Sequence, residues 1–324
     1  MTKAIGLLSG GLDSILATRL LQDQGIEILA VCFKSPFFGF RKAQRAVVQL
    51  KVSLQIIDIS DEHLQLVRNP KYGYGRNMNP CIDCHIMMLK RAGYLLEKEH
   101  LDFIFTGDVL GQRPMSQNRR VLQLVSRESG YEELILRPLS AKLLPETRPE
   151  KEGKVDRGRL LDIRGRSRKE QFELAKRYGI GDFPEPAGGC LLTDPAFSRR
   201  LRDLLAHQDE LQIRDIELLK VGRHFRLDES TKVVIGRRKE ENERLLELAH
   251  EGDMIIEVAD YPGPTALIPH GGSKSCIEIG ASLCIRYSDA PSNIPILVLL
   301  EKDGKEEKLE SPACSRVTCQ ALII

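Results

Sequence analysis

The stretch LSGGLDS, residues 8–14, decides the fold class of this chain. It joins an apolar run that begins at residue 4 to a helical pattern over 13–25. Further apolar runs at 26–35, 54–60 and 102–108 alternate with helical patterns at 40–52 and 84–100. Strands that alternate with helices are typical of a parallel sheet covered on both faces. Residues 1 to about 180 are therefore predicted to form a doubly wound α/β domain.

Composition restricts the class of protein. The chain has 324 residues, of which 42% are hydrophobic and 29% charged, so two or three compact units with apolar cores are expected and disorder is excluded. The formal net charge is only +2, so a nucleic-acid partner would have to be held by local basic patches. The N-terminus lacks the apolar segment of a signal peptide and no run is long enough to span a membrane. We expect a cytoplasmic protein without a membrane partner.

The pattern changes after residue 189. A helical segment over 194–208 is followed by a predicted hairpin over 224–238, a helix over 239–252 and short strands. The tail contains a second hairpin signal at Asp303-Gly304. We predict two domains, an α/β domain over 1–190 and a smaller α+β domain over 215–324, joined by a connecting helix within 191–214.

The loop at 8–14 favours an anion site. A strand that leads through a glycine-rich turn into a helix directs backbone N–H groups at one point, where phosphate is the usual ligand. The loop lacks the lysine and spacing of a Walker A motif. The alternative is an ordinary tight turn in which a serine or aspartate caps the helix.

Three of the eight cysteines form a pattern of their own. Cys81 and Cys84 form a C-x-x-C pair where a predicted helix starts, and Cys190 follows two glycines. A helix N-terminus favours thiolate, so the pair is a candidate for redox, catalytic or metal-binding chemistry. Three thiolates are one fewer than a closed zinc site needs, but they leave one iron of a four-iron cluster open. Structural cysteines and a zinc knuckle are the alternatives.

The loop resembles the pyrophosphate loop of the ATP-pyrophosphatase (PP-loop) superfamily, whose α/β fold resembles that of the adenine nucleotide alpha hydrolases. These enzymes adenylate a carbonyl or carboxyl oxygen and release pyrophosphate. The resemblance implies that backbone near Val31 to Phe33 holds the adenine of ATP, and that Mg²⁺ lies near Asp13. The implied nucleotide ligands are Ser9, Gly10, Gly11, Asp13, Ser14, Phe33, Gly107, Asp108 and Gln112.

Two more segments resemble tRNA thiouridine synthases. NPCIDCH at 79–85 is similar to a motif of the tRNA 2-thiouridylases, and TGDVLGQRPMSQN at 106–118 to one of the tRNA 4-thiouridine synthases. In the persulfide-dependent enzymes an aspartate usually stands at the position of Cys81. Its replacement resembles the cluster-dependent branch, which implies a [4Fe-4S] cluster on Cys81, Cys84 and Cys190. Persulfide chemistry at Cys84 and Cys190 is the competing mechanism.

The C-terminal domain resembles the RNA-binding module of NFACT proteins through VGRHFRL at 221–227 and VIGRRKEEN at 234–242. The implied partner is tRNA, because the arginine fork suits phosphate geometry. The candidate contacts in this domain are Arg223, Arg226, Arg237 and Arg238. A second basic run could bind the tRNA body and comprises Arg157, Arg159, Arg164, Arg166, Arg168 and Lys169.

The resemblance as a whole implies ATP-dependent tRNA thiolation. A uridine oxygen would be adenylated, and sulfur transfer involving Cys84, Cys190 and Asp13 would then release AMP. The implied partners are tRNA and a sulfur donor, which could be free sulfide, a cysteine desulfurase or a sulfur-carrier protein, and a homodimer is one option. Two other classes stay open: a PP-loop enzyme that inserts sulfur or nitrogen into a small molecule, and a catalytically inactive RNA-binding protein.

Overall fold

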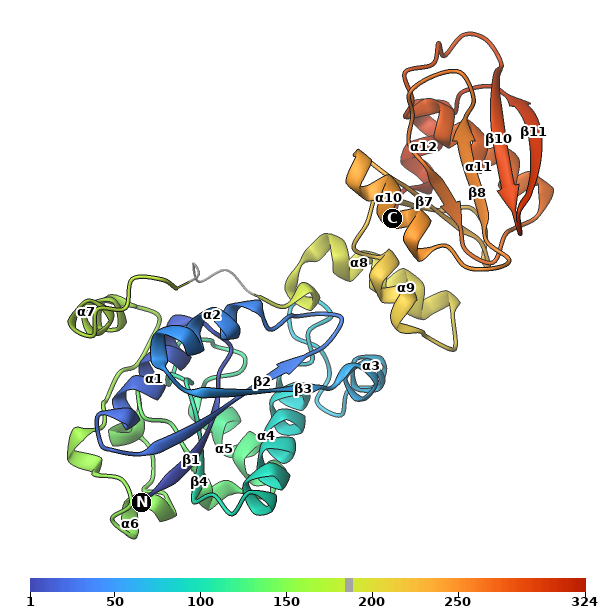
Figure 1. The fold of residues 1–324 in the computed structure, drawn as a ribbon. Helices are drawn as coiled ribbons and strands as arrows, with labels where there is room; N and C mark the ends of the chain where they lie inside the picture. Colours follow the sequence, from blue (N-terminus) through green and yellow to red (C-terminus); the bar gives the residue numbers. More distant parts are fainter. Residues whose placement is uncertain (184–188) are drawn as a thin grey trace. The chain divides into compact units, whose positions relative to one another are not determined.

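The computed structural model describes residues 1–183 and 189–324, and the chain divides into two compact units, residues 1–193 and 194–324 (Figure 1). Each unit has its own sheet and its own apolar core. No helix in the described part of the chain is long and apolar enough to cross a membrane.

The first unit is built on a five-stranded parallel sheet with the strand order β3-β2-β1-β4-β5. The strands are β1 (Lys3–Leu7), β2 (Glu27–Lys34), β3 (Ser53–Asp58), β4 (Phe103–Thr106) and β5 (Ile135–Leu136). The order reverses at β1, which is the topological switch point where doubly wound sheets bind ligands. The predicted α/β class is confirmed.

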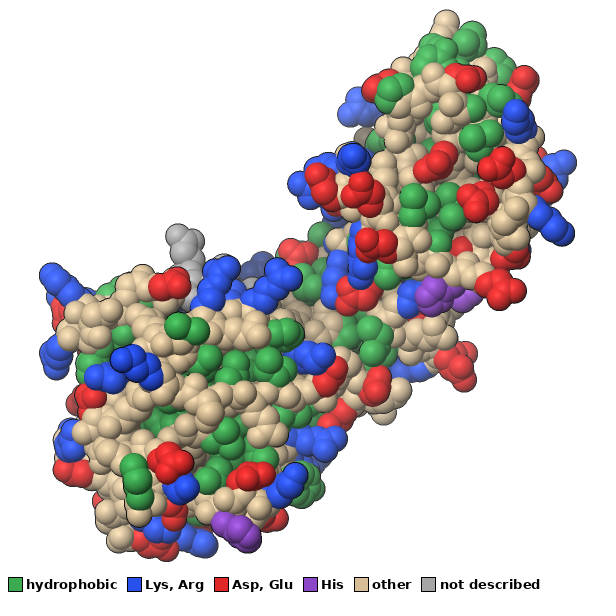
Figure 2. Space-filling model, viewed as in Figure 1, with side chains coloured by type: hydrophobic (Ala, Val, Ile, Leu, Met, Phe, Trp, Pro, Cys, Tyr) green, Lys and Arg blue, Asp and Glu red, His purple; other side chains and the backbone are tan. Residues whose placement is uncertain are grey.

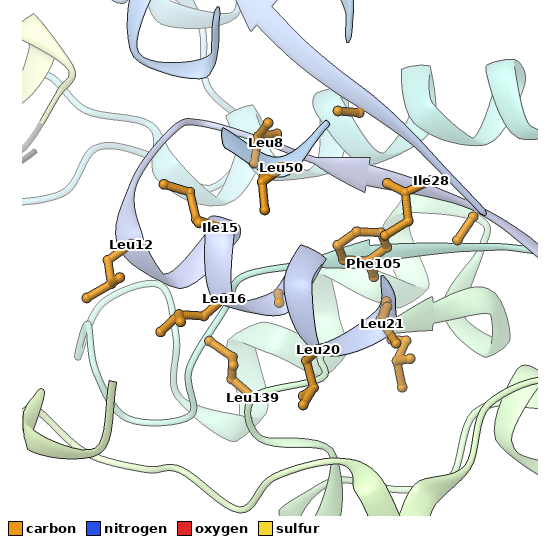
Figure 3. Packing of buried hydrophobic residues seen from close by; sticks show 14 of the residues in the cluster. Leu8, Leu12, Ile15, Leu16, Leu20, Leu21, Ile28, Leu50, Phe105 and Leu139 are labelled. Atoms are coloured by element: carbon orange, nitrogen blue, oxygen red, sulfur yellow. The ribbon is translucent and has the colours of Figure 1, made fainter. Parts of the chain in front are cut away.

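Helices cover both faces of this sheet (Figure 1). They are α1 (Leu12–Gln22), α2 (Arg41–Leu50), α3 (Ser60–Arg68), α4 (Cys81–Lys98), α5 (Arg119–Ser129), α6 (Arg148–Lys151) and α7 (Lys169–Arg177). One core packs α1, α2 and α7 against the sheet, and Figure 3 shows Ile15, Leu16 and Leu20 of α1 within it. The other core contains the apolar faces of α4 and α5. Burial on both faces explains the nearly continuous apolar runs of the strands.

The charged stretch between β5 and α7, residues 137–168, is hydrogen-bonded to other parts of the first unit. It contains short 3₁₀ turns at Ala141–Leu143 and Arg157–Arg159. Arg164 forms an isolated parallel bridge with Leu110, and the Gly165 N–H donates to the Leu110 carbonyl at 2.8 Å. The stretch is thus tied to the loop that follows β4.

The second unit is built on a six-stranded antiparallel sheet with the order β11-β10-β8-β9-β7-β6. Its strands are β6 (Arg223–Arg226), β7 (Lys232–Ile235), β8 (Met254–Val258), β9 (Ala266–Ile268), β10 (Ile296–Lys302) and β11 (Lys305–Ser311). Its helices are α8 (Pro195–His207), α9 (Ile213–Leu218), α10 (Lys239–Leu248), α11 (Lys274–Arg286) and α12 (Arg316–Leu322). Both predicted hairpins are confirmed, β6–β7 and β10–β11, the latter with Asp303 and Gly304 at positive φ.

Candidate active site

The loop at residues 8–14, called the phosphate loop below, has the geometry of an anion site. Gly10 has a φ of 75°, and a Cβ at this position would lie 2.3 Å from the Lys42 carbonyl carbon, so only glycine fits. Gly11 is the N-cap of α1 and offers no side-chain cap. The first N–H groups of α1 therefore stay available for a ligand at the positive end of the helix dipole.

The two serines of the loop hold its shape. Ser14 Oγ donates to the Gly11 carbonyl at 2.8 Å, and Ser9 Oγ accepts from the Gly11 N–H at 3.3 Å. The two hydroxyl oxygens lie 3.4 Å apart. Both side chains therefore stabilise the turn between β1 and α1 and keep their hydroxyl groups at the start of the helix.

The end of β4 closes against the same loop. A Cβ on Gly107 would lie 2.5 Å from the Ser14 nitrogen, so a larger residue would separate β4 from α1. Asp108 accepts from Thr106 Oγ1 at 2.8 Å and from Gln117 Nε2 at 2.9 Å, and it forms an ion pair with Arg137 at 3.6 Å. Asp108 is therefore fully engaged in ordering the β4 loop.

Electrostatics keep Asp108 ionised. Burial raises the pKa of its carboxyl, but the neighbouring charges of His85 and Arg137 and the two hydrogen bonds outweigh burial, so the pKa lies below its ordinary value. A buried carboxylate with a paired arginine is a fixed negative charge at the sheet edge. Its hydrogen bonds order residues 106–117 next to the loop at 8–14.

Asp13 is the centre of a polar network. Its carboxylate accepts from Gln112 Nε2 at 2.7 Å and from Arg168 Nη2 at 3.3 Å. Gln171 Nε2 in turn donates to Gln112 Oε1 at 2.9 Å. The sequence predicted Asp13 and Gln112 as site residues but gave no signal for Gln171, and it placed Arg168 in a tRNA-binding run.

Phe33 lies on β2 at the same edge of the sheet. β1 ends at Leu7, which is paired with Val31, so Phe33 lies beyond the end of β1. On the other side Phe33 is paired with Ile57 of β3. Its side chain is buried in the core under α4, which leaves its backbone as the part that a ligand could contact.

The C-x-x-C pair occupies the first turn of α4, as predicted. Cys81 is the first helical residue, and its sulfur accepts from Asn79 Nδ2 at 3.2 Å. Asp83 accepts from the Lys71 and Tyr72 N–H groups at 3.1 Å each, which ties the preceding loop to the helix. Cys81 and Cys84 therefore lie in a helical turn whose conformation these hydrogen bonds stabilise.

Cys190 is held beside this pair by two hydrogen bonds of its neighbours. Leu191 donates its N–H to the Phe37 carbonyl at 2.9 Å, and Asn77 Nδ2 donates to the Thr193 carbonyl at 2.7 Å. Asn77 belongs to the loop that leads into the C-x-x-C turn. Residues more than 100 positions apart in the chain are thereby brought to one place.

The thiols interact electrostatically. Burial is the main cause that raises the pKa of Cys84 well above its ordinary value, and Cys190 and Cys81 add to it. Burial likewise raises the pKa of Cys190 to about 11, with a further contribution from Cys81. The negative charges of these thiolates would therefore act against one another.

No compact single-ion site accompanies them. Within residues 1–183 and 189–324, no group of three or more His, Cys, Asp or Glu side chains is arranged to hold one metal ion. The ligands of a four-iron cluster bind different iron atoms and need not converge on one point. Thiols are the donors that such a cluster takes, so the type of donor fits the predicted group.

The arginines predicted to face RNA have mostly intramolecular partners. Arg226 pairs with Asp203, and Arg237 pairs with Glu241 through both carboxylate oxygens. Arg223 lies over the Tyr287 ring at 4.5 Å. Arg238 keeps a side chain that is 74% exposed. In the other predicted run, Arg157 and Arg159 bond within the first unit, to Glu150 and the Asp23 carbonyl.

Two family models match parts of the chain. Residues 1–142 match the family model described as thiamine biosynthesis protein (ThiI), and residues 222–317 match the model described as NFACT protein RNA binding domain. Part of the N-terminal unit is thus similar to the ThiI family and most of the C-terminal unit to the NFACT RNA-binding domain family. The resemblance seen in the sequence is confirmed at this level.

Curated relatives agree with the first match. A probable tRNA sulfurtransferase of Thermoanaerobacter sp. (strain X514) is 31% identical over 121 residues, which are 34% of this chain and 30% of the relative. One of Thermococcus kodakarensis is 28% identical over 142 residues, 42% and 36% of the two chains. The tRNA-specific 2-thiouridylase MnmA of Helicobacter hepaticus is 25% identical over 139 residues, 39% and 40% of the two chains. The chain thus spans between about a third and two fifths of these relatives.

Among solved structures, the chain is similar to a 4-thiouridine synthetase in complex with RNA and bound ATP. The two are 23% identical, with a TM-score of 0.41, and the match covers 68% of this chain and 52% of the other.

Proposed function

We propose that this chain is an ATP-dependent tRNA sulfurtransferase that replaces a carbonyl oxygen of a uridine with sulfur. The observations that support the proposal are an uncapped glycine-rich helix N-terminus after β1 and, in the same unit, a C-x-x-C turn tied by Asn77 to the segment that carries Cys190. The first supports ATP chemistry and the second supports sulfur chemistry. The relatives of the N-terminal domain and the RNA-binding type of the C-terminal domain support tRNA as the substrate.

The first half-reaction is adenylation. The uracil oxygen attacks the α-phosphorus of ATP, the bond from that phosphorus to the bridging oxygen of the β-phosphate breaks, and pyrophosphate leaves. Uracil oxygen is itself a poor leaving group, whereas the adenylated oxygen departs with AMP. The N–H groups at the start of α1 and the hydroxyls of Ser9 and Ser14 stabilise the negative charge of the pyrophosphate.

Magnesium accompanies the nucleotide in this proposal. Mg²⁺ prefers carboxylate and phosphate oxygens. Asp13 supplies a carboxylate at the first turn of α1, held in place by Gln112. Asp13 is therefore the protein ligand proposed for the ion, directly or through water.

The second half-reaction is sulfur transfer. A sulfur atom attacks the activated carbon with an electron pair, the carbon–oxygen bond breaks, and AMP leaves with the former uracil oxygen. Cys81, Cys84 and Cys190 would hold the predicted [4Fe-4S] cluster, which supplies sulfide at its unligated iron when bound. Binding of cations would also relieve the mutual repulsion of the three thiolates.

The same cysteines allow a persulfide route. There a sulfane-sulfur donor such as a cysteine desulfurase first loads a persulfide on Cys84 or Cys190. The outer sulfur of the persulfide then attacks the carbon, and the other thiolate breaks the sulfur–sulfur bond. The product is a Cys84–Cys190 disulfide, which a thiol reductant must reduce before the next turnover. Iron and sulfide analysis of anaerobically purified protein separates the routes: iron lost from the Cys81→Ala, Cys84→Ala and Cys190→Ala variants supports the cluster, and a fully active, iron-free wild type supports the persulfide.

One assay tests the function itself. Purified protein is incubated anaerobically with MgATP, an unmodified tRNA transcript and either sodium sulfide or a cysteine desulfurase with cysteine, and both pyrophosphate and thiouridine are measured. We expect both products, each dependent on tRNA. Cys190→Ala should keep pyrophosphate release and lose thiouridine, while the control Cys314→Ala, in the second unit, should keep both. Absence of pyrophosphate and thiouridine with wild-type protein would contradict the proposal.

A second candidate is sulfur insertion into a small molecule. The description of the family model that matches residues 1–142, a thiamine biosynthesis protein, favours keeping it. Pyrophosphate release that proceeds at full rate without tRNA would support this candidate over tRNA thiolation.

A further inference from the structure

Arg168 lies at the phosphate loop although 155 positions separate it from Asp13. Its Nη2 donates to Asp13 Oδ1 at 3.3 Å, and its side chain is only 15% exposed. The guanidinium also lies over the Phe172 ring, 5.6 Å from the ring centre. Arg168 is therefore held on two sides beside the start of α1.

The fold fixes the segment that carries Arg168. The bridge between Leu110 and Arg164 and the 2.8 Å bond from the Gly165 N–H to the Leu110 carbonyl align this segment with the loop after β4. Ile163 donates its N–H to the Leu139 carbonyl at 2.9 Å, at the end of β5. Backbone hydrogen bonds thus lead the chain to the phosphate loop just before α7 begins.

The charges at this place are unbalanced. The N-terminus of α1 carries partial positive charge, so an arginine beside it is unfavourable unless an anion lies between them. The loop at 8–14 contains one acidic residue, Asp13, and no basic residue. One carboxylate faces both a guanidinium and a helix N-terminus, and a polyanion would improve this balance.

Arg168 also has unused bonding capacity. Its Nε is buried and has no hydrogen-bond partner among the residues that the structure describes. Guanidinium groups bind phosphate with two parallel N–H donors, and the single contact with Asp13 uses one. A phosphate group would supply the missing acceptor.

We propose that Arg168 binds the β and γ phosphates of ATP, and that it moves from Asp13 to these phosphates when the nucleotide enters. This inference rests on the proposed function, since it requires that the chain binds ATP. The guanidinium then offsets the charge that develops on pyrophosphate as its bond to the α-phosphorus breaks. The same movement frees Asp13 Oδ1 for the magnesium ion.

The test compares two nucleotides. Dissociation constants for MgATP and for AMP are measured by calorimetry on wild type, Arg168→Ala, Arg168→Lys and the control Arg177→Ala, whose exposed side chain lies at the end of α7. Loss of charge-assisted bonds to phosphate should weaken MgATP binding roughly 10- to 100-fold in Arg168→Ala, with AMP binding unchanged. Arg168→Lys should weaken MgATP binding less, because an ammonium keeps the charge but not the fork.

Each other outcome has a distinct meaning. MgATP binding by Arg168→Ala that equals wild type would overturn the proposal and leave the proposed function standing. Equal loss of MgATP and AMP binding in both Arg168 variants would also overturn it, because it would show that Arg168 only maintains the loop. A wild type that binds neither nucleotide would contradict the proposed function itself.

Discussion

Single residues show how closely this fold controls charge. Lys232 on β7 is 6% exposed, and its Nζ has no hydrogen-bond partner among the described residues. Burial is the main cause that lowers the pKa of Lys232 to about 8, although Asp215 and Asp203 act in the opposite direction. A buried ammonium group without a hydrogen-bond partner destabilises the fold, so Lys232 lowers the stability of the second unit.

This lowered pKa predicts a pH dependence. Between pH 8 and the ordinary lysine value near 10.5, the unfolded chain binds more protons than the folded one, so the free energy of unfolding rises with pH in this window. The rise is on the order of 3 kcal/mol at most. Lys232→Met should abolish that part of the slope, whereas Lys305→Met, at an exposed lysine of β11, should keep it. Urea denaturation from pH 7 to pH 10 measures the effect, and parallel curves for wild type and Lys232→Met would contradict it.

At the residue scale, the sequence predicted only some of the side chains that make up the candidate site. The small residues of the loop were predictable because a glycine at positive φ and a helix start leave a local pattern. The contact of Arg168 with Asp13 and that of Gln171 with Gln112 were not predictable, because both depend on tertiary packing that no spacing encodes. Likewise the arginine runs predicted as RNA contacts could not be separated from ion pairs, since the carboxylates that pair with them lie elsewhere in the chain.

At the scale of elements, the feature that places Cys190 near the C-x-x-C turn is a contact between two loops. The segment after Gly189 and the loop before α4 meet through the bond from Asn77 to the Thr193 carbonyl. The order of strands and helices was predictable from the alternation of apolar runs, because burial on both faces imposes it. That Cys190 joins Cys81 and Cys84 was implied only by the family resemblance, because no spacing in the chain encodes the side-chain bond from Asn77.

Removing this bond should loosen Cys190. In Asn77→Ala the loss of about 1 kcal/mol should raise amide exchange over residues 189–193 roughly 5-fold and lower thiouridine formation. The MgATP dissociation constant should stay the same, because Asn77 has no contact with the phosphate loop in the structure. Asn69→Ala, at an exposed position in the same loop region, is the control. Unchanged exchange over 189–193 would show that other contacts hold the segment.

At the scale of the whole molecule, the C-terminal unit has edges of different charge. The β10–β11 hairpin carries more acidic than basic side chains, and Figure 2 shows red side chains with blue ones among them over this part of the surface. The acidic residues are Glu301, Asp303, Glu306, Glu307 and Glu310, and the lysines are Lys302, Lys305 and Lys308. β6 forms the other edge of the sheet, and the exposed Arg238 follows its partner β7. RNA phosphates are expected at the β6–β7 side and not at β10–β11.

A pair of variants tests this division. Arg238→Ala should weaken tRNA binding several-fold for every tRNA and reduce the slope of log affinity against log salt by about 1. Lys308→Ala, on the acidic strand β11, should change neither quantity. MgATP affinity should be the same in both variants, because both positions belong to the second unit. Equal effects of the two substitutions on tRNA affinity would show that charge alone, without a defined face, governs binding.

Nucleoside mass spectrometry is the most direct way to determine whether this chain thiolates tRNA. Total tRNA is prepared from cells that lack the gene and from the same cells complemented with wild type or with Cys190→Ala, and its nucleosides are quantified. We expect that one thiouridine disappears in the deletion, returns with wild type and stays absent with Cys190→Ala. A thiouridine profile that is identical in all four strains, parent included, would contradict the account.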